Sequence, residues 1–525
     1  MPEPTQVRIG DIVVLTKAAE RRLEQNHSMW NDDLRPCSLA EHSWPGSKFA
    51  SLWIGMCLCI PTYALAGGMI AGGMSWWEAV LTILVGSVVV MGAILLVSHA
   101  GTKFGIPYPV FARLWFGTTG AHVPALARAV IAAGWFGINS WFGGQALDAI
   151  LTRVLPFWSS LAVTFPLPAP QPYPAPLHLA FSFLIFWAIN VAIAMRGPQA
   201  IGRLAQIAAP LLGISAIGLL LWALASAHGF GPILAQPATL HGPSFWNAFF
   251  PSVIGVIAFW ATLALNIPDY TRYAKSQRGQ MLGQITSMPL TMALFSFIGI
   301  AVTSATVLVF GTALWNPVEL IVKFPLPVVL LAGVIVILSS VTINVGANVM
   351  APARAFENLR PQQITFAIGA VITGLLSLAT MPWYMLSTFA TYIFTWLGTY
   401  GALLGPFDGI AIADYWLVRK RRLDLAQLYT PGGIYAYARG FNLRAVVALA
   451  IGWGVAALGL IVPSLHFLWS GGWLFGLIGG LAGYWLLMKN DKSVIDERNY
   501  ESITKVEASP REEPAPWVVP SPAAQ

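Results

Sequence analysis

The chain has 525 residues, of which 56% are hydrophobic and only 10% are charged. This composition, with a mean hydropathy of +0.67, indicates an integral membrane protein and excludes a water-soluble enzyme. We interpret the net charge of +7 as membrane topology and not as affinity for nucleic acid, because the basic residues alternate from loop to loop.

Twelve apolar stretches each approach or exceed the roughly 20 residues that a membrane-spanning helix needs. We predict spans at 49–73, 77–98, 121–147, 177–195, 204–226, 248–268, 284–312, 325–349, 363–380, 386–404, 443–463 and 466–488. A long polar segment without a short apolar core or cleavage site precedes the first span, so we expect no secretory signal peptide.

Lys and Arg gather in the loops that follow the even-numbered spans. The strongest cluster, 419–422, follows span ten, whereas the intervening loops carry only Arg153 and Lys323. By the positive-inside rule, we expect both termini on the cytoplasmic side of the plasma (inner) membrane. Phosphate binding by the 419–422 cluster is the alternative.

Spans one and six carry helix-breaking residues. The first has Gly55 and Pro61, and the sixth has Gly255 and ends at Pro268. A broken backbone inside hydrocarbon persists only where protein or a polar cavity surrounds it. We therefore predict that both spans unwind and that the breaks mark the binding site of a transporter.

Span three places Trp135 and Asn139 four residues apart and therefore on one helical face. An indole stacks on a flat heterocycle, and a carboxamide offers a donor and an acceptor to an imide or ureide edge. Trp260 in span six adds a second indole that we expect at a similar depth. The alternative is ordinary helix packing, since the chain contains 22 Trp.

Span eight contains a polar run in an otherwise apolar helix. Ser339 and Thr342 share one face, and Asn344 and Asn348 share another. One helix can therefore serve both a cation and a ligand, although hydroxyls and small residues also mediate helix packing.

Chemical motifs of other kinds are missing from the sequence. It carries no metalloprotease, phosphate-binding-loop or nucleophile-elbow motif. Cys37, Cys57 and Cys59 indicate neither a disulfide nor a metal site, because two of them face away from each other on a helix.

Six separated motifs lie along the chain at Asn31–Pro36, Ile60–Tyr63, Trp135–Trp141, Asn266–Arg272, Asn344–Asn348 and Asp414–Arg419. In order and spacing they resemble the nucleobase:cation symporter-1 family over roughly residues 30–490. The chain looks similar to bacterial allantoin and hydantoin permeases, with uracil permeases nearby.

The resemblance implies an all-α integral membrane protein with 12 transmembrane helices and a leucine-transporter-like fold. Two inverted repeats of five helices would occupy 46–225 and 247–418, followed by two C-terminal helices at 440–489. We expect a cytoplasmic tail at 1–45 and a disordered cytoplasmic tail at 490–525.

Carried over by position, the resemblance implies that Trp135 and Trp260 sandwich the substrate ring. Asn139 and Asn348 would hydrogen-bond the edge of the ring. Cys59 occupies the position at which relatives carry an amide side chain.

The resemblance also implies a sodium site. Its oxygens would be the carbonyls of Gly55, Leu58 and Ser339 and the hydroxyl of Thr342. Ile343 stands where the sodium-coupled pattern has a second hydroxyl, so proton coupling stays open.

Asp408 is an ionisable residue at membrane depth, which costs at least ~2.5 kcal/mol at a helix centre and is often functional. It is a candidate proton site. We prefer the interpretation that it lies hydrated near the cytoplasmic interface, because Asp414 and the basic cluster follow closely. Asp269, after Pro268, is interpreted as a structural cap or an ion-pair partner.

These observations predict secondary active symport of a small, planar, neutral nitrogen heterocycle with Na⁺ or H⁺ by alternating access. The ring would be allantoin-like, hydantoin-like or a pyrimidine nucleobase such as uracil. We expect no cofactor besides the coupling ion, no nucleic-acid partner, and a monomer in the lipid bilayer. A membrane-embedded enzyme that uses Asp408, Asp414 and Asp269 is the alternative, as is a passive channel or sensor on the same scaffold.

Overall fold

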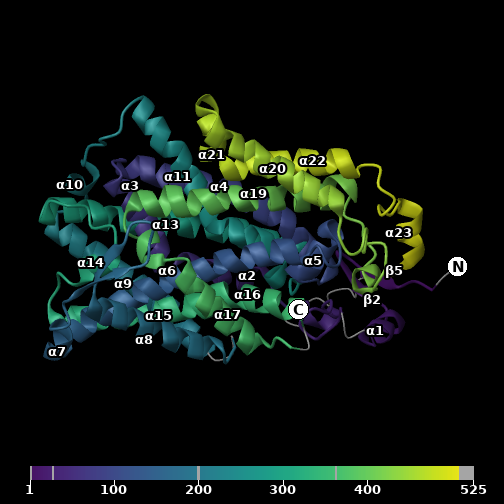
Figure 1. Cartoon of the computed structure of the whole chain (residues 1–525), viewed down its shortest axis with the longest axis horizontal. Helices are drawn as coiled ribbons and strands as arrows, with labels where there is room; N and C mark the ends of the chain where they lie inside the picture. The colour runs from purple at the N-terminus through teal and green to yellow at the C-terminus, as the bar shows by residue number, and fades with distance from the viewer. Residues whose placement is uncertain (1–2, 26–28, 198–201, 361–362, 508–525) are drawn as a thin grey trace, which may run out of the picture.

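Long apolar helices lie side by side along the long axis of the molecule (Figure 1). The computed structural model describes residues 3–25, 29–197, 202–360 and 363–507. Helices suit these stretches because their backbone hydrogen bonds leave no polar group facing hydrocarbon. The main helices are α2 (Gly46–Cys57), α3 (Ile60–Ala71), α4 (Trp76–Phe104), α6 (His122–Val154), α8 (Leu177–Ala194), α9 (Gly202–Ser226), α11 (Pro243–Asn266), α13 (Gln277–Phe310), α15 (Leu326–Ile343), α17 (Phe366–Ala379), α19 (Gly398–Ile412), α20 (Leu443–Ile461) and α22 (Gly472–Met488).

Shorter elements connect the main helices. The short α-helices are α1 (Lys17–Glu24), α5 (Tyr108–Phe116), α7 (Pro156–Ser159), α10 (Phe230–Leu234), α12 (Pro268–Thr271), α14 (Pro317–Ile321), α16 (Met350–Leu359), α18 (Pro382–Met385), α21 (His466–Ser470) and α23 (Glu497–Ile503). Three π-helical segments are η3 (Asn344–Val349), η4 (Thr391–Leu397) and η5 (Ala413–Val418). Short 3₁₀ turns are η1 (Leu39–Glu41), η6 (Ala426–Tyr429) and η7 (Pro463–Leu465).

The lengths of the helices fit a membrane protein. Among the described residues, six helical segments are each long and apolar enough to cross a membrane, and two bent pairs raise this number to eight. Two further apolar helices, Pro210–Ser226 and Phe366–Ala379, are shorter. The predicted all-α membrane architecture is confirmed. The number of twelve spans and the division into two repeats stay predictions.

The predicted break in span one is present between α2 and α3. Leu58 (ψ 77°) and Cys59 (φ −145°, ψ 158°) leave the helical conformation, and the two helices meet at an angle of 56°. Pro61 then lies in the first turn of α3, where its missing N–H leaves no helical bond unmade. The break therefore lies immediately before the proline.

The predicted break in span six is wrong. Helix α11 runs without interruption from Pro243 to Asn266 and contains both Pro251 and Gly255. Glycine keeps both backbone hydrogen-bonding groups, so in a helix it costs only about 1 kcal/mol relative to alanine. Gly255 serves close packing, because a Cβ there would lie 3.2 Å from Cγ2 of Ile393. The helix does end before Pro268, as predicted.

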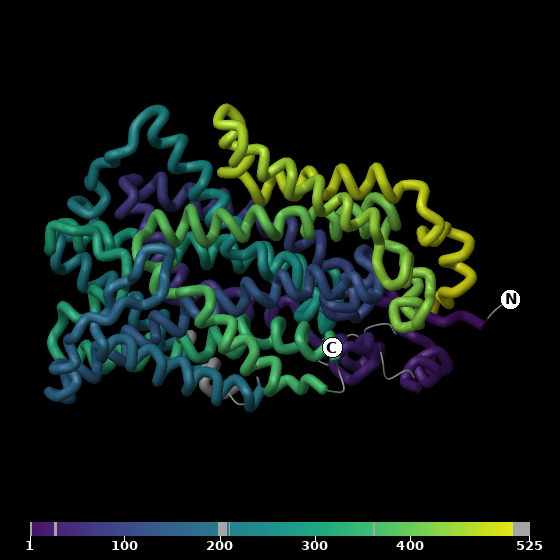
Figure 2. Tube along the Cα trace, in the orientation of Figure 1, coloured from purple at the N-terminus to yellow at the C-terminus, as the bar shows by residue number. Residues whose placement is uncertain are grey.

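The predicted disorder at 490–525 is corrected for the residues that the structure describes. Strand β5 (Thr504–Glu507) pairs in parallel with β1 (Gln6–Ile9), which pairs antiparallel with β2 (Ile12–Leu15). Figure 2 follows the chain from the purple N-terminal segment to the yellow C-terminal segment, and the two meet at one end of the molecule. The buried Gln6 side chain reinforces the pairing by donating to Thr504 Oγ1 (2.8 Å). Residues 508–525 lie outside the described part.

A second small sheet lies in the Pro-rich connection between α7 and α8. Strands β3 (Thr164–Leu167) and β4 (Tyr173–Pro176) form an antiparallel pair there. This hairpin contacts the helical body through Pro168, whose carbonyl accepts a hydrogen bond from Nε1 of Trp383 (2.7 Å).

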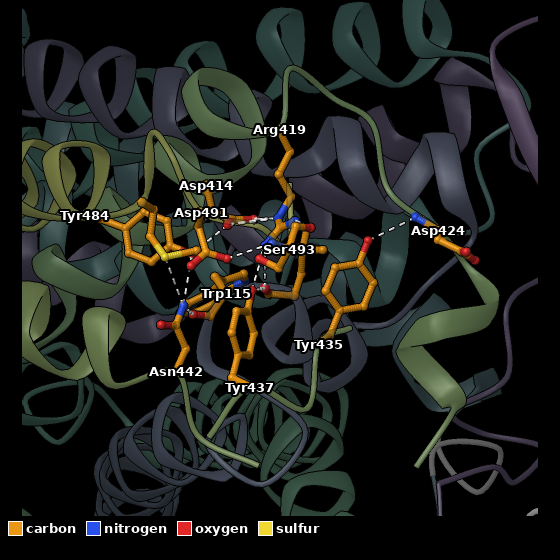
Figure 3. Close-up of polar contacts among 12 residues, drawn as sticks. Trp115, Asp414, Arg419, Asp424, Tyr435, Tyr437, Asn442, Tyr484, Asp491 and Ser493 are labelled. Carbon is orange, nitrogen blue, oxygen red and sulfur yellow. Dashed lines mark hydrogen bonds and ion pairs between the residues drawn. The ribbon is translucent and has the colours of Figure 1, made fainter. Parts of the chain in front are cut away.

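The first residue of the basic 419–422 cluster is not a free surface charge. Figure 3 shows the Arg419 guanidinium directed at Asp414, and Nε lies 3.0 Å from each carboxylate oxygen. Nη1 donates to the Ser493 carbonyl (2.8 Å) and Nη2 to the Tyr437 hydroxyl (2.6 Å), while Tyr484 donates to Asp414 (2.6 Å). Both charged side chains are fully buried. The pair therefore joins η5 and α22 to the C-terminal segment.

Candidate substrate-binding cavity

A buried cavity of about 50 Å³ lies at the break between α2 and α3. Helices α6 and α11 and the polar run of span eight form its other walls. The lining residues are Met56, Cys59, Pro61, Arg128, Trp135, Asn139, Phe259, Trp260, Thr262, Leu263, Ile343, Ala347 and Asn348. All five residues that the sequence predicts to bind substrate are among them. Ligand pockets commonly measure ~300 Å³ or more, so a bound ring requires the lining side chains to move.

The two predicted indoles are buried and held in different ways. Trp135 donates from Nε1 to the Tyr400 hydroxyl (3.2 Å), which itself donates to the Ala258 carbonyl (2.9 Å). Trp260 packs edge-on against Trp53 with ring centroids 5.2 Å apart. Phe259 contacts both indoles, with its ring centroid 4.9 Å from that of Trp135 and 5.1 Å from that of Trp260. Neither indole faces lipid, since they are 6% and 3% exposed.

The two predicted carboxamides are held by hydrogen bonds within their own helices. Asn139 donates to the carbonyl of Trp135 (3.1 Å), and Asn348 donates to Oδ1 of Asn344 (3.0 Å). Asn344 in turn donates to the carbonyl of Phe136 (3.2 Å). Asn344 thus orients Asn348 and ties η3 to α6. π-Helical segments such as η3 frequently occur at functional sites.

Cys59 lies at the break itself. Its Sγ is 3.1 Å from the hydroxyl of Thr62, and the residue is 3% exposed.

Arg128 also lines the cavity, and the sequence reasoning missed it. It is 3% exposed, and its Nε donates to the carbonyl of Thr262 (3.0 Å) and to Oδ1 of Asn266 (3.1 Å). Nη1 is buried without a hydrogen bond. The signal was available, because Arg128 lies seven residues before Trp135 on the same helical face and is a basic residue within an apolar span.

The residues of the predicted cation site lie on two elements, with Gly55 and Leu58 at the end of α2 and Ser339 and Thr342 on α15. The Cys59 amide donates to the Cys57 carbonyl (3.0 Å) and not to that of Gly55, which a continuous helix would use. Across from α3, the Thr342 hydroxyl donates to the Ser339 carbonyl (2.9 Å). Within the described ranges, no group of three or more His, Cys, Asp and Glu residues is placed to hold a metal ion. A cation would therefore depend on carbonyl and hydroxyl oxygens.

Asp408 is not hydrated, contrary to the interpretation that we preferred. It is fully buried, Oδ2 accepts a hydrogen bond from Nε1 of Trp473 (3.0 Å), and Oδ1 has no hydrogen bond. Gly405 and Gly409 explain the burial, because a Cβ at either residue would clash with backbone carbonyls of α22. The predicted hydration is thus wrong, the depth of Asp408 relative to the membrane interface stays a prediction, and Asp408 does not line the cavity.

Asp269 acts as the predicted structural cap. Its Oδ1 accepts a hydrogen bond from the amide of Tyr108 (2.8 Å), the first residue of α5. Its Oδ2 accepts one from Asn266 (3.3 Å).

A mostly helical membrane protein whose broken helix lines a central cavity of indoles and carboxamides is a secondary transporter of the leucine-transporter-like class. More narrowly, this chain belongs to the family of permeases for cytosine and purines, uracil, thiamine and allantoin, whose sequence profile matches residues 37–487. The family resemblance that the motifs indicated is confirmed.

Individual relatives agree with this assignment. The chain is 39% identical to the purine-uracil permease of Arabidopsis thaliana, over 88% of this chain and 78% of that protein. It is 38% identical to the allantoin permease of Bacillus subtilis, over 89% of this chain and 94% of that protein. A nucleobase-cation-symport-1 family transporter, solved in a closed conformation with bromovinylhydantoin bound, superposes with a TM-score of 0.72 at 25% identity and covers 90% of this chain and 99% of that chain. The findings support the transporter and not the enzyme or the channel.

Proposed function

We propose that this transporter imports a small planar nitrogen heterocycle together with a cation by alternating access. The observation that carries the proposal is the convergence of Cys59, Trp135, Asn139, Trp260 and Asn348 on one buried cavity at a helix break. The names of the relatives support an allantoin- or hydantoin-like ring or a pyrimidine such as uracil.

The chemistry of the cavity suits such a ring. Trp135 and Trp260 present π-systems for stacking, and Asn139 and Asn348 present amide groups for an imide or ureide edge. Stacking is tolerant of ring identity, whereas the amides require complementary donors and acceptors. The indoles therefore provide general affinity, and the amides hydrogen-bond rings whose edge carries donors or acceptors.

Two candidates exist for the coupling ion. For Na⁺, the support is the carbonyl of Gly55, which the helix break releases from its helical bond, together with Leu58, Ser339 and Thr342. For H⁺, the support is the buried carboxyl group of Asp408, one oxygen of which has no hydrogen bond. Replacing Na⁺ by choline at constant pH stops uptake if Na⁺ drives it. Dissipating the proton gradient stops it if H⁺ does.

The placement in the cell follows from charge. The alternation of basic loops supports a plasma (inner) membrane protein with both termini in the cytoplasm, and a monomer is sufficient because one chain supplies the whole cavity. Labelling of single introduced cysteines from either side of the membrane tests the topology.

Counterflow in proteoliposomes tests the proposed transport directly. Vesicles preloaded with unlabelled uracil or allantoin should accumulate the labelled compound transiently, because a carrier returns from the inside faster when it is loaded. A pore or an enzyme shows no such acceleration. Equal uptake into preloaded and empty vesicles, for uracil, allantoin and hydantoin alike, would contradict the proposal.

A further inference from the structure

Two residues that line the cavity carry hydrogen-bond donors that lack acceptors. Of the lining side chains in the described ranges, two have buried nitrogen atoms without a hydrogen bond, Arg128 Nη1 and Trp260 Nε1. Both atoms can only donate. Buried polar atoms are nearly always paired in folded proteins, and a buried donor without an acceptor is destabilising. A guest that brings acceptors to these atoms would therefore form hydrogen bonds that the chain alone does not make.

Arg128 also forms no direct ion pair with any carboxylate of the described part of the chain. Asp269 is connected to it through Asn266, and its other oxygen is already bonded to the Tyr108 amide. A buried charge that is not paired is strongly unfavourable, so a partner that enters the cavity gains this interaction.

We propose that Arg128 binds a ring oxygen of the substrate and selects rings with two carbonyl groups, such as uracil, hydantoin and allantoin, over amino-substituted or cationic ones. This inference rests on the proposed function and narrows its substrate class. Uracil has two carbonyl oxygens, and each can accept a hydrogen bond from Arg128 Nη1. Cytosine has only one carbonyl oxygen. At the position of the second carbonyl of uracil, it carries an amino group, which is a hydrogen-bond donor. Thiamine carries a positive charge, which the guanidinium repels.

The same geometry explains why the selection resides in Arg128 and not in the amides. Asn139 and Asn348 can each offer either a donor or an acceptor, so they accommodate both uracil and cytosine. A guanidinium has no acceptor and cannot adapt. A site with fixed polarity discriminates strongly, because the wrong ring leaves buried groups unpaired.

Binding measured by tryptophan fluorescence of the purified full chain tests the proposal, with uracil and cytosine as ligands of closely similar size. The wild type should bind uracil at least about tenfold more tightly than cytosine. Arg128→Met should weaken uracil binding about 10- to 100-fold and bring the two affinities close together, while Arg128→Lys should retain part of the preference. Arg113→Met is the matched control, since Arg113 is a buried arginine that donates to the Met29 and Leu428 carbonyls away from the cavity.

The ratio of the two affinities separates recognition from a structural role. Loss of the hydrogen bonds from Arg128 to α11 would weaken the binding of both ligands equally. An unchanged ratio of the two affinities in Arg128→Met therefore overturns the proposal. Should that variant fail to fold, the wild type alone decides, because equal or tighter binding of cytosine also overturns it. If the wild type binds none of uracil, hydantoin and allantoin, the proposed function itself fails. If the wild type binds them and Arg128→Met leaves the ratio of the uracil and cytosine affinities unchanged, the proposed function stands without this role for Arg128.

Discussion

Arg419 and Arg128 are both buried, and they differ in how their guanidinium groups are satisfied. Arg419 bonds to both oxygens of Asp414, to a carbonyl and to a hydroxyl (Figure 3). Arg128 uses Nε for two bonds and leaves Nη1 without any. The contrast separates a charge that holds the fold together from one that is available to a ligand. The Asp414–Arg419 cluster is thus structural, and we propose that the cavity is functional.

The largest effect we expect is on the structural side of this comparison. Asp414→Ala leaves Arg419 buried without its counter-charge, which should lower the free energy of unfolding by about 3–5 kcal/mol. Thermal unfolding in detergent measures the loss. Tyr484→Phe is the matched control, because it removes only one hydrogen bond to Asp414 (2.6 Å) and should cost about 1 kcal/mol. Equal stability of the two variants would mean that the ion pair does not hold the cluster together.

The next effect concerns the cavity. Trp135→Ala removes a stacking surface and should weaken uracil binding about 10- to 100-fold without unfolding the protein, since stacking of a base on an aromatic ring contributes about 1–3 kcal/mol. Trp135→Phe should recover part of the affinity. Equilibrium binding of labelled uracil measures both, with Trp77→Ala as a control because Trp77 is 52% exposed. Unchanged affinity in Trp135→Ala would remove the stacking hypothesis.

A smaller effect on binding is expected from the loss of a hydrogen bond to the polar edge of the ring than from the loss of stacking on its face. Asn348→Ala should weaken uracil binding about tenfold, because one hydrogen bond in a buried site is lost. The loss should be much smaller for 1,3-dimethyluracil, whose ring has no N–H group to present to the amide. Competition binding with uracil and 1,3-dimethyluracil measures the loss of affinity for each ligand. Equal losses would indicate that Asn348 acts through packing alone.

The smallest effect belongs to a partly exposed ion pair, which contrasts with the buried one. Arg35 bonds to both oxygens of Glu41 (2.7 and 2.8 Å) and lowers the pKa of that carboxyl group from 4.5 to about 2. The stabilisation is therefore complete above pH 4.5 and is lost as the pH falls from 4.5 towards 2. Glu41→Gln should cost less than about 1 kcal/mol at pH 7, because solvent screens the pair. A difference from the wild type that grows on acidification would contradict this assignment.

Local sequence patterns predicted much of the cavity. A spacing of four residues is enough to place Trp135 and Asn139 on one face of α6, and Pro61 is enough to place a break in span one. Arg128 could be inferred from the same helical periodicity, because it precedes Trp135 by seven residues within an apolar span. A charge within an apolar span has to be weighed separately from the topology signal.

The remaining differences depend on contacts between distant segments. Asp408 is buried because α22 packs on Gly405 and Gly409, and no local pattern predicts which helix covers a carboxylate. Strand β5 forms only because β1 offers it an edge, and these strands are separated by nearly the whole chain. The continuity of α11 shows that a glycine inside an apolar helix reports close packing as readily as a break.

A structure of the protein with bound uracil tests the central claim most directly. We expect the ring between Trp135 and Trp260, with one carbonyl oxygen within hydrogen-bonding distance of Arg128 Nη1. A ring bound elsewhere, or one stacked in this cavity with its oxygens turned away from Arg128, would contradict the account.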